Sequence, residues 1–127
     1  MKKNLFLLAS LLFIKAATAQ FSCTGLVTTN APYKGFPQTF TVPAGVVQVR
    51  ISISGGSGGV ASGSAFTAGG GATVWAYITV IPGDVFKIII GQKGINGDFD
   101  ASGGGSSEVK KNGILLMVAG GGGGEDN

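Results

Sequence analysis

The glycines constrain the fold of this chain more than any other feature. All 24 lie after residue 19, and most are clustered within 55–71, 103–105 and 120–124. Glycine loses more backbone entropy on folding than any other residue, so ordered glycine has to be compensated by close packing. Either the clusters are long mobile loops, which composition alone favours, or they are extended polyproline-II-type segments. Such segments can stack through backbone N–H···O and Cα–H···O contacts.

Between the clusters the sequence is typical of β-strands. It is rich in Val, Ile, Thr and aromatic residues, which favour strands. In 47–54, Val and Ile alternate with Gln, Arg and Ser, a period of two that predicts one buried and one exposed face. We expect strands at 39–42, 47–54, 72–80, 85–90, 106–109 and 114–119. No segment after residue 19 has a helical period, so the fold class predicted is all-β, an antiparallel arrangement.

Turn sequences separate these strands. The Ile81-Pro82-Gly83-Asp84 segment predicts a reverse turn that joins 72–80 and 85–90 as a hairpin. Another turn is expected at 111–113, before the last strand. Residues 91–99 form three collagen-like triplets, but they contain no proline, which argues against a triple helix. A glycine turn leaving the hairpin is expected there instead.

The first residues have the pattern of an export signal. Lys2 and Lys3 precede an almost wholly apolar run, 5–14, and Ala17-Thr18-Ala19 fits a signal-peptidase site. The run is too short to span a hydrocarbon core, which needs about 20 residues. We therefore expect residues 1–19 to be a cleaved signal peptide, 20–35 an N-terminal extension and 36–127 a glycine-rich β domain. An uncleaved anchor or a buried helix is the alternative.

Charge excludes one class of function. Three of the nine basic residues lie within the signal, which leaves six basic and six acidic residues and a mature net charge of zero. A nucleic-acid interface needs a basic stripe to neutralise phosphates, so no nucleic-acid partner is expected. Lys110 and Lys111 are interpreted as a solvated hairpin end. Cys23 is the only cysteine; it is free, pairs between chains, or pairs with a further part of the protein. A lipid-modified N-terminus is a further alternative, although residues 20–22 do not resemble a lipobox.

The sequence offers little for catalysis. It has no histidine, the commonest general base, and no phosphate-binding glycine motif. We expect neither an enzyme nor a cofactor. Asp98, Asp100 and Ser102 match the first half of a calcium loop, but its bidentate Glu is missing because the twelfth position is Val109. These three residues are therefore a weak calcium candidate, and a polar turn is the alternative.

Trp75 and Tyr77 are the candidate ligand-binding residues. They share one predicted strand face with Thr73 and Thr79. On a solvent-exposed face, aromatic rings beside hydroxyl groups can stack on sugars while the polar groups make hydrogen bonds. The alternative is that a second sheet or the glycine segments cover this face.

The order of the segments resembles the glycine-rich domain family. The matching segments, in order, are 40–45 (FTVPAG), the alternating strand, 54–59, 69–72, 82–84, 88–94, 103–107 and 118–124. They cover about residues 36–124 and are similar to the extracellular glycine-rich region of anaplastic lymphoma kinase and leukocyte tyrosine kinase. Bacterial surface proteins and phage tail adhesins carry comparable regions.

The resemblance implies a jelly-roll-like antiparallel β sandwich decorated with glycine helices of the polyproline-II type. It also implies recognition outside the cell: a secreted or cell-surface adhesion module whose partner is an extracellular protein or a glycan. The rival is a structural packing unit of a larger surface protein with no ligand of its own. The chain differs from the family in having no kinase and no second cysteine. It ends at Asn127 after a glycine run, so we expect the domain to be incomplete at its C-terminus.

Overall fold

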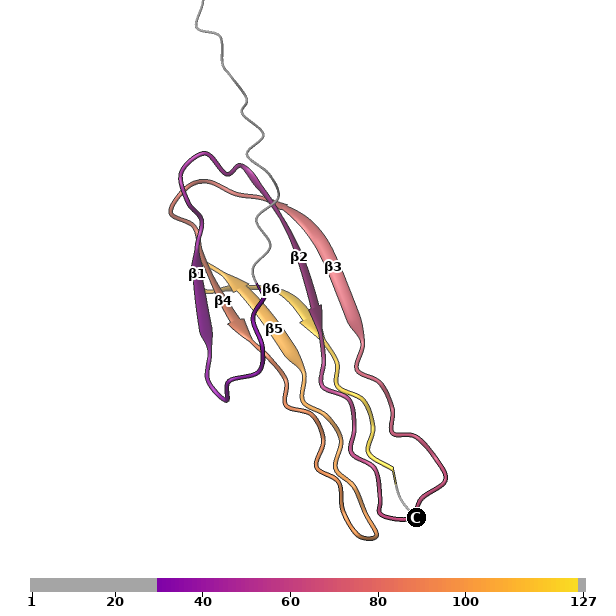
Figure 1. Ribbon diagram of the computed structural model, residues 1–127. Coiled ribbons are helices and arrows are strands. Elements are labelled where there is room, and N and C mark those ends of the chain that lie inside the picture. Colours follow the sequence, from indigo (N-terminus) through magenta and orange to yellow (C-terminus); the bar gives the residue numbers. More distant parts are fainter. Residues whose placement is uncertain (1–29, 126–127) are drawn as a thin grey trace, which may run out of the picture.

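The computed structural model describes residues 30–125 and is elongated, with the strands at one end and the glycine segments at the other (Figure 1). Its strands are β1 (Gln38–Thr41), β2 (Gln48–Ser54), β3 (Thr73–Thr79), β4 (Val85–Ile89), β5 (Ser107–Lys111) and β6 (Ile114–Ala119). The described residues contain no helix. The all-β prediction is therefore confirmed, and each predicted strand is found with its ends shifted by at most two residues.

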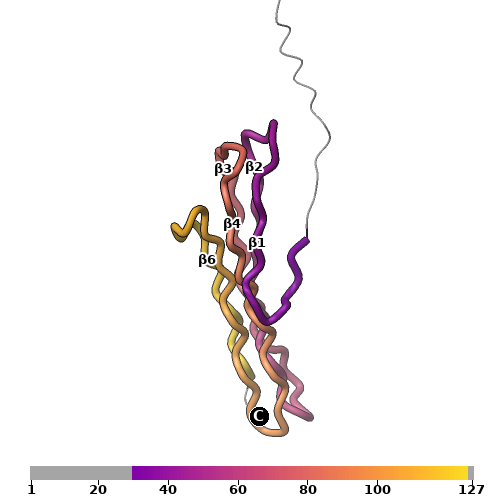
Figure 2. Tube along the Cα trace, turned by 90° about the vertical axis from the view of Figure 1, so that its left-hand side faces the viewer, coloured from indigo at the N-terminus to yellow at the C-terminus, as the bar shows by residue number. Residues whose placement is uncertain are grey.

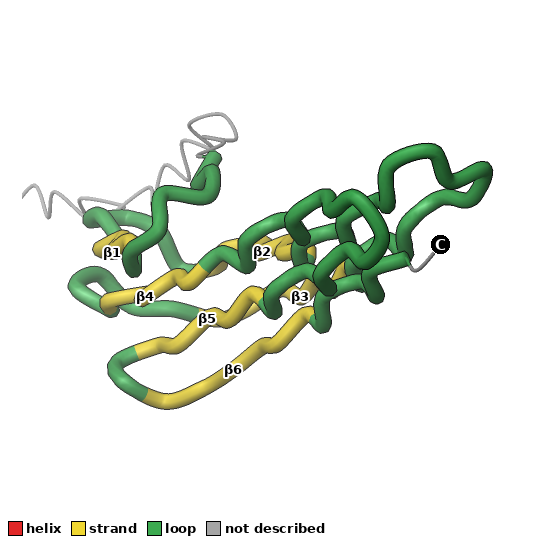
Figure 3. The backbone as a smooth tube through the Cα atoms, turned by 90° about the horizontal axis from the view of Figure 1, so that it is seen from below, coloured by secondary structure: helices red, strands yellow, loops and turns green. Residues whose placement is uncertain are grey.

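The strands form two antiparallel sheets. One has the order β1-β4-β5-β6, and the other consists of β2 and β3 alone. Strand β2 lies against β5 and β6, and β3 lies against β6. A view from below shows the two groups of strands at one end and the loop segments extending from the other (Figure 3).

The predicted hairpin of 72–80 with 85–90 is wrong. A turn does form at 81–84, where the Asp84 N–H donates to the Ile81 carbonyl at 3.1 Å, but it leads from one sheet to the other. Strand β3 pairs with β2 and β4 pairs with β1 and β5. The physical reason is burial: with β3 and β4 in different sheets, the apolar side chains of both strands face the one core between the sheets.

The last two strands do form the hairpin that the sequence predicts. Asn112 and Gly113 occupy its two-residue turn with positive φ values of 48° and 85°. This is the backbone that an Asn-Gly pair adopts most readily between antiparallel strands. A β-bulge follows, because Val109 faces Met117 whereas Lys110 faces Leu115.

The core of the strand region draws on both sheets. Its buried members are Val42, Ile53, Val80, Phe86, Val109, Met117 and Ala119. The alternation predicted for 47–54 is confirmed within β2, since Val49 and Ile51 pack against this core while Arg50 and Ser52 are exposed. It is wrong for Val47, which precedes the strand and is 62% exposed. Two sheets thus share one set of apolar side chains, which is the main source of stability for strands of this length.

The glycine segments are held by a different set of contacts. They run side by side away from the strands (Figure 1), and their backbones exchange hydrogen bonds that recur every third residue. Gly55 and Gly58 donate to the carbonyls of 72 and 69, and Gly56 and Gly59 donate to those of 105 and 102, all at 2.9 Å. Segment 55–59 therefore bonds to 69–72 and to 102–105 at every third residue, and it also accepts bonds from Gly94 and Gly122.

Glycine is required in this region because the backbones lie too close together for a side chain. A Cβ atom at Gly58 would collide with the Gly123 carbonyl, and one at Gly56 would collide with the Gln92 carbonyl. The glycine turn expected at 91–99 is found only at its end, where the chain bends at 98–99, and is wrong for the residues before it. Gly91 and Gly94 instead face the carbonyls of Gly105 and Ser102 within an extended segment. The triplet spacing places a glycine at each close approach.

One buried serine joins the two regions. Ser107 is fully buried, and its hydroxyl donates to the Ser54 carbonyl at 2.6 Å while accepting the Gly91 N–H at 2.9 Å. Ser54 ends β2 and Gly91 follows β4, so this hydroxyl ties both sheets together where the glycine segments begin. Buried polar groups of this kind are stable only when they are hydrogen-bonded.

The predicted signal peptide and Cys23 lie outside the described residues. Within 30–125 no helix has the length and apolar character that crossing a membrane requires. Seen from the side, the glycine segments continue the direction of the strands in a narrow body (Figure 2).

Candidate functional site

The outward face of β2 and β3 carries the predicted aromatic pair. We call it the aromatic face. Its side chains alternate with those that pack on the core, and the register sets Arg50 opposite Tyr77 and Ser52 opposite Trp75. Its members are Gln48, Arg50, Ser52 and Ser54 on β2 and Thr73, Trp75, Tyr77 and Thr79 on β3.

The rings on this face are open to solvent. Trp75 is 57% exposed and Tyr77 is 62% exposed. Of the two arrangements left open by the sequence, the described residues therefore adopt the one in which nothing covers the pair. Their centroids lie 6.0 Å apart with ring planes at 86°. This edge-to-face arrangement is favoured by the ring quadrupoles, and it forms a right-angled corner between two apolar surfaces.

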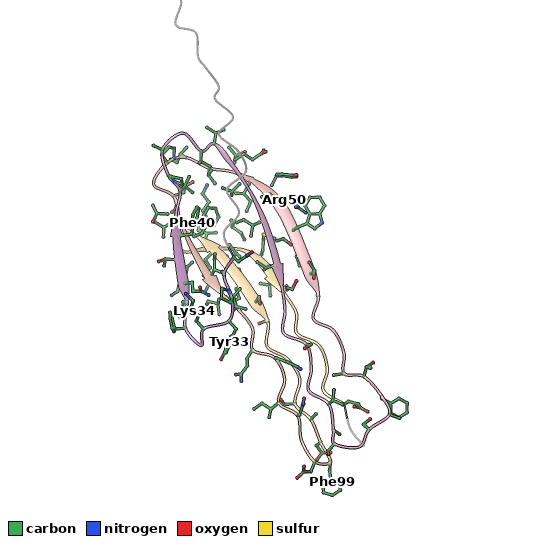
Figure 4. The ribbon with its side chains drawn as sticks, viewed as in Figure 1. Tyr33, Lys34, Phe40, Arg50 and Phe99 are labelled. Carbon is green, nitrogen blue, oxygen red and sulfur yellow. The ribbon has the colours of Figure 1, made fainter. Side chains whose placement is uncertain are left out.

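Arg50 completes the corner from the neighbouring strand. Its guanidinium carbon lies 5.2 Å from the Trp75 ring centroid, within the range of a cation–π interaction. Figure 4 shows Arg50 beside β2 and β3 in the strand region, far from Phe99 at the tip of the glycine segments. Sequence reasoning missed Arg50 as a site residue. The missing information was the pairing of β2 with β3, because Arg50 is remote from both rings in sequence.

Most polar groups on the aromatic face are free to bind a ligand. Ser54 and Thr73 share a hydrogen bond of 2.7 Å between their hydroxyls, which marks one end of the face. The side chains of Gln48, Arg50, Ser52, Tyr77 and Thr79 make no hydrogen bond to another described residue. The face therefore combines exposed rings with unused donors and acceptors.

A second polar cluster fixes the other end of β3. Asp84 is 6% exposed, and its carboxylate accepts bonds from Lys111 at 2.8 Å and from Asn112 at 2.8 Å. The Lys111 bond, followed by those from Asn112 and the Ile81 N–H, lowers the pKa of Asp84 to about 2. Lys111 also donates to the Thr79 carbonyl at 3.2 Å. The interpretation of Lys111 as solvated is therefore wrong: it is an internal partner. The cluster joins the turn at 81–84 to the β5–β6 hairpin.

The structure does not assemble the calcium candidate into a cluster. Asp98 and Asp100 are exposed beside Phe99 at the far tip of the glycine segments (Figure 4). The Ser102 hydroxyl instead accepts the Ile95 N–H at 2.8 Å. Across the described part of the chain, no group of three or more His, Cys, Asp or Glu residues is placed to hold a metal ion. Calcium binding by these residues stays a prediction.

No model of a known protein family matches the chain, and none of the curated proteins compared with it matches its sequence. The site must therefore be interpreted from its own geometry.

Proposed function

We propose that this chain is an exported, non-catalytic recognition module that binds an extracellular glycan through its aromatic face. The supporting observation is the exposed corner of Trp75 and Tyr77, because an exposed apolar patch with a polar rim marks an interaction site. Sugar rings present C–H groups on one side and hydroxyls at the rim. They fit a surface that has aromatic rings at its centre and free polar groups around it.

The fold proposed for this module is a jelly-roll-like β sandwich whose glycine segments are polyproline-II helices, as in the glycine-rich domain family. The three-residue period of the hydrogen bonds supports this, since a polyproline-II helix has three residues per turn. In this arrangement the strand region presents the aromatic face, and the glycine region is a rigid extension.

The single tryptophan gives a direct test of glycan binding. We expect the mature protein to show the emission of a water-exposed indole and ready quenching by acrylamide. A binding glycan should shift that emission and protect it from the quencher, with a saturable dependence on glycan concentration. A Trp75→Ala variant should lose binding on a glycan array while keeping the wild-type melting temperature. Blue-shifted emission that acrylamide cannot reach would exclude the proposed site.

A second candidate function, a structural packing unit, is favoured by a different observation. Strand β6 pairs with β5 on one edge, and its side chains Ile114, Leu115, Leu116 and Val118 are between 42% and 69% exposed. Gly70, Gly120 and Gly123 are also exposed, and a Cβ atom on each would meet nothing within 4 Å. An apolar edge strand and an open glycine surface both suit a neighbouring polypeptide.

Sedimentation and glycan binding separate the two functions. A packing unit should self-associate or aggregate, and Leu116→Thr together with Val118→Thr should restore a monomer. A recognition module should bind its glycan with equal affinity before and after these changes, because they leave the aromatic face intact. If the double variant abolishes glycan binding while it stays folded, the aromatic face is not an independent site.

A further inference from the structure

The charge on the aromatic face is unbalanced. Arg50 is the only formally charged side chain among its eight members, and no carboxylate of residues 30–125 forms an ion pair with it. Lys111, which lies near the Thr79 end, is neutralised by Asp84 at 2.8 Å. An anionic ligand group would therefore pair with Arg50 without displacing an internal partner.

The Arg50 guanidinium is positioned by the Trp75 ring, and its N–H groups remain available to a ligand. Its contact with the Trp75 ring at 5.2 Å restricts its position, while its N–H groups make no hydrogen bond to another described residue. A planar guanidinium can donate two parallel N–H···O bonds to a carboxylate, and a neutral ester cannot accept them as charge-assisted bonds. The restriction by the ring lowers the entropy cost of forming that pair.

We propose that the ligand is an acidic saccharide in which a sugar carboxylate binds Arg50 and the sugar ring lies in the corner of Trp75 and Tyr77. This inference rests on the proposed function, whose site it shares. The right angle between the rings lets a pyranose place its C–H face on one ring and its edge against the other. Ser52 and Gln48 then remain beside it for hydroxyl groups.

The test uses two polysaccharide fragments that differ only in charge. Oligogalacturonates carry one carboxylate on every sugar, and their methyl esters have the same backbone with the charge removed. Binding of each to the mature protein is followed by Trp75 fluorescence at low and at high salt. The variants are Arg50→Gln and Arg50→Lys, both of which keep the fluorescent Trp75. The matched control is Lys87→Gln, which removes one exposed charge from the other sheet.

We expect the wild-type protein to bind the acid about tenfold more tightly than the ester, because a charge-assisted bidentate pair is added. Arg50→Gln should abolish that preference and bind acid and ester alike. Arg50→Lys should keep part of the preference, since lysine keeps the positive charge but lacks the planar guanidinium that donates two parallel bonds. Lys87→Gln should behave as wild type. The preference should shrink as salt screens the exposed pair.

The results distinguish this inference from the function on which it rests. Equal binding of acid and ester by wild type, or a preference that survives Arg50→Gln, overturns the acidic saccharide while leaving glycan binding in place. Equal affinity for dextran sulfate and the acid overturns the specific role of the carboxylate. If neither fragment nor any neutral glycan changes Trp75 fluorescence, the proposed function itself fails.

Discussion

The strand region and the glycine region of this molecule are both closely packed, the first through its side chains and the second through its backbone. In the strand region, side chains such as Phe86 and Val109 fill the space between two sheets and are 1% and 0% exposed. In the glycine region, the absence of side chains lets backbones approach until their N–H and carbonyl groups bond directly. Removing a side chain should therefore damage the first region, whereas adding one should damage the second.

The largest effect is expected from adding one methyl group at Gly58. The new Cβ would collide with the Gly123 carbonyl, a backbone group that cannot move without breaking the Gly69 bond to it. Gly58→Ala should therefore cost more than about 4 kcal/mol or prevent folding. Gly123→Ala is the matched control, because its Cβ meets nothing within 4 Å. It should change stability by less than about 1 kcal/mol. Urea unfolding measures both. Equal effects would mean that the segments are not close-packed.

The reverse change should break the strand region. Phe86→Ala removes the largest fully buried side chain of the core and should cost about 3–5 kcal/mol. Phe66→Ala is the control: Phe66 is 74% exposed, so its loss should change stability by no more than about 0.5 kcal/mol. Thermal melts followed by circular dichroism would show the difference. A small effect at Phe86 would contradict a side-chain core.

A substitution at the junction between the two regions should have an intermediate effect on stability. Ser107→Ala leaves the Ser54 carbonyl and the Gly91 N–H without their buried partner, at a cost of about 1–3 kcal/mol. Ser106→Ala, its exposed neighbour, should have little effect. Hydrogen exchange at the Gly91 amide adds a local measurement. Unchanged protection of that amide in Ser107→Ala would show that the serine does not hold the junction.

The smallest effect should appear as a dependence of stability on pH. The pKa of Asp84 falls from 3.8 to about 2 on folding, so its contribution is present above the unfolded pKa and is lost as pH falls through the folded one. Wild-type melting temperature should therefore drop between about pH 4 and pH 2. The Asp84→Asn variant should have a lower melting temperature than wild type at neutral pH. Its melting temperature should also change less across that pH window. A variant with the wild-type slope would exclude Asp84 as the source, and Asp98→Asn serves as the control.

Local chemistry in the sequence was enough to locate the strands. The alternation in β2 and the Asn-Gly turn before β6 are properties of a few neighbouring residues, and both were predicted correctly. Pairing was not predictable in the same way. The turn at 81–84 fits a hairpin as well as it fits a connection between two sheets. The burial of Phe86 against residues of both sheets is what favours pairing β4 with β1 rather than with β3.

The aromatic face was predicted only in part. Period-two alternation placed Trp75 and Tyr77 on one side of a strand, but it could not say whether another layer covered them. Arg50 joined them only through the β2–β3 register. The glycine region shows the same limit. Composition alone favoured mobile loops, and the regular spacing at 91, 94 and 97 was the signal for close approaches every third residue.

Amide hydrogen exchange across the glycine region tests most directly whether these segments are packed structure. The amides of Gly56, Gly58 and Gly122 donate to neighbouring segments at 2.8–2.9 Å, whereas the Gly123 amide makes no hydrogen bond to another described residue. If the segments are packed, the first three should exchange orders of magnitude more slowly than Gly123, with protection comparable to that of β5 amides. Uniform exchange at the rate of an unfolded chain would contradict a packed glycine region and leave the strand region as the only folded part.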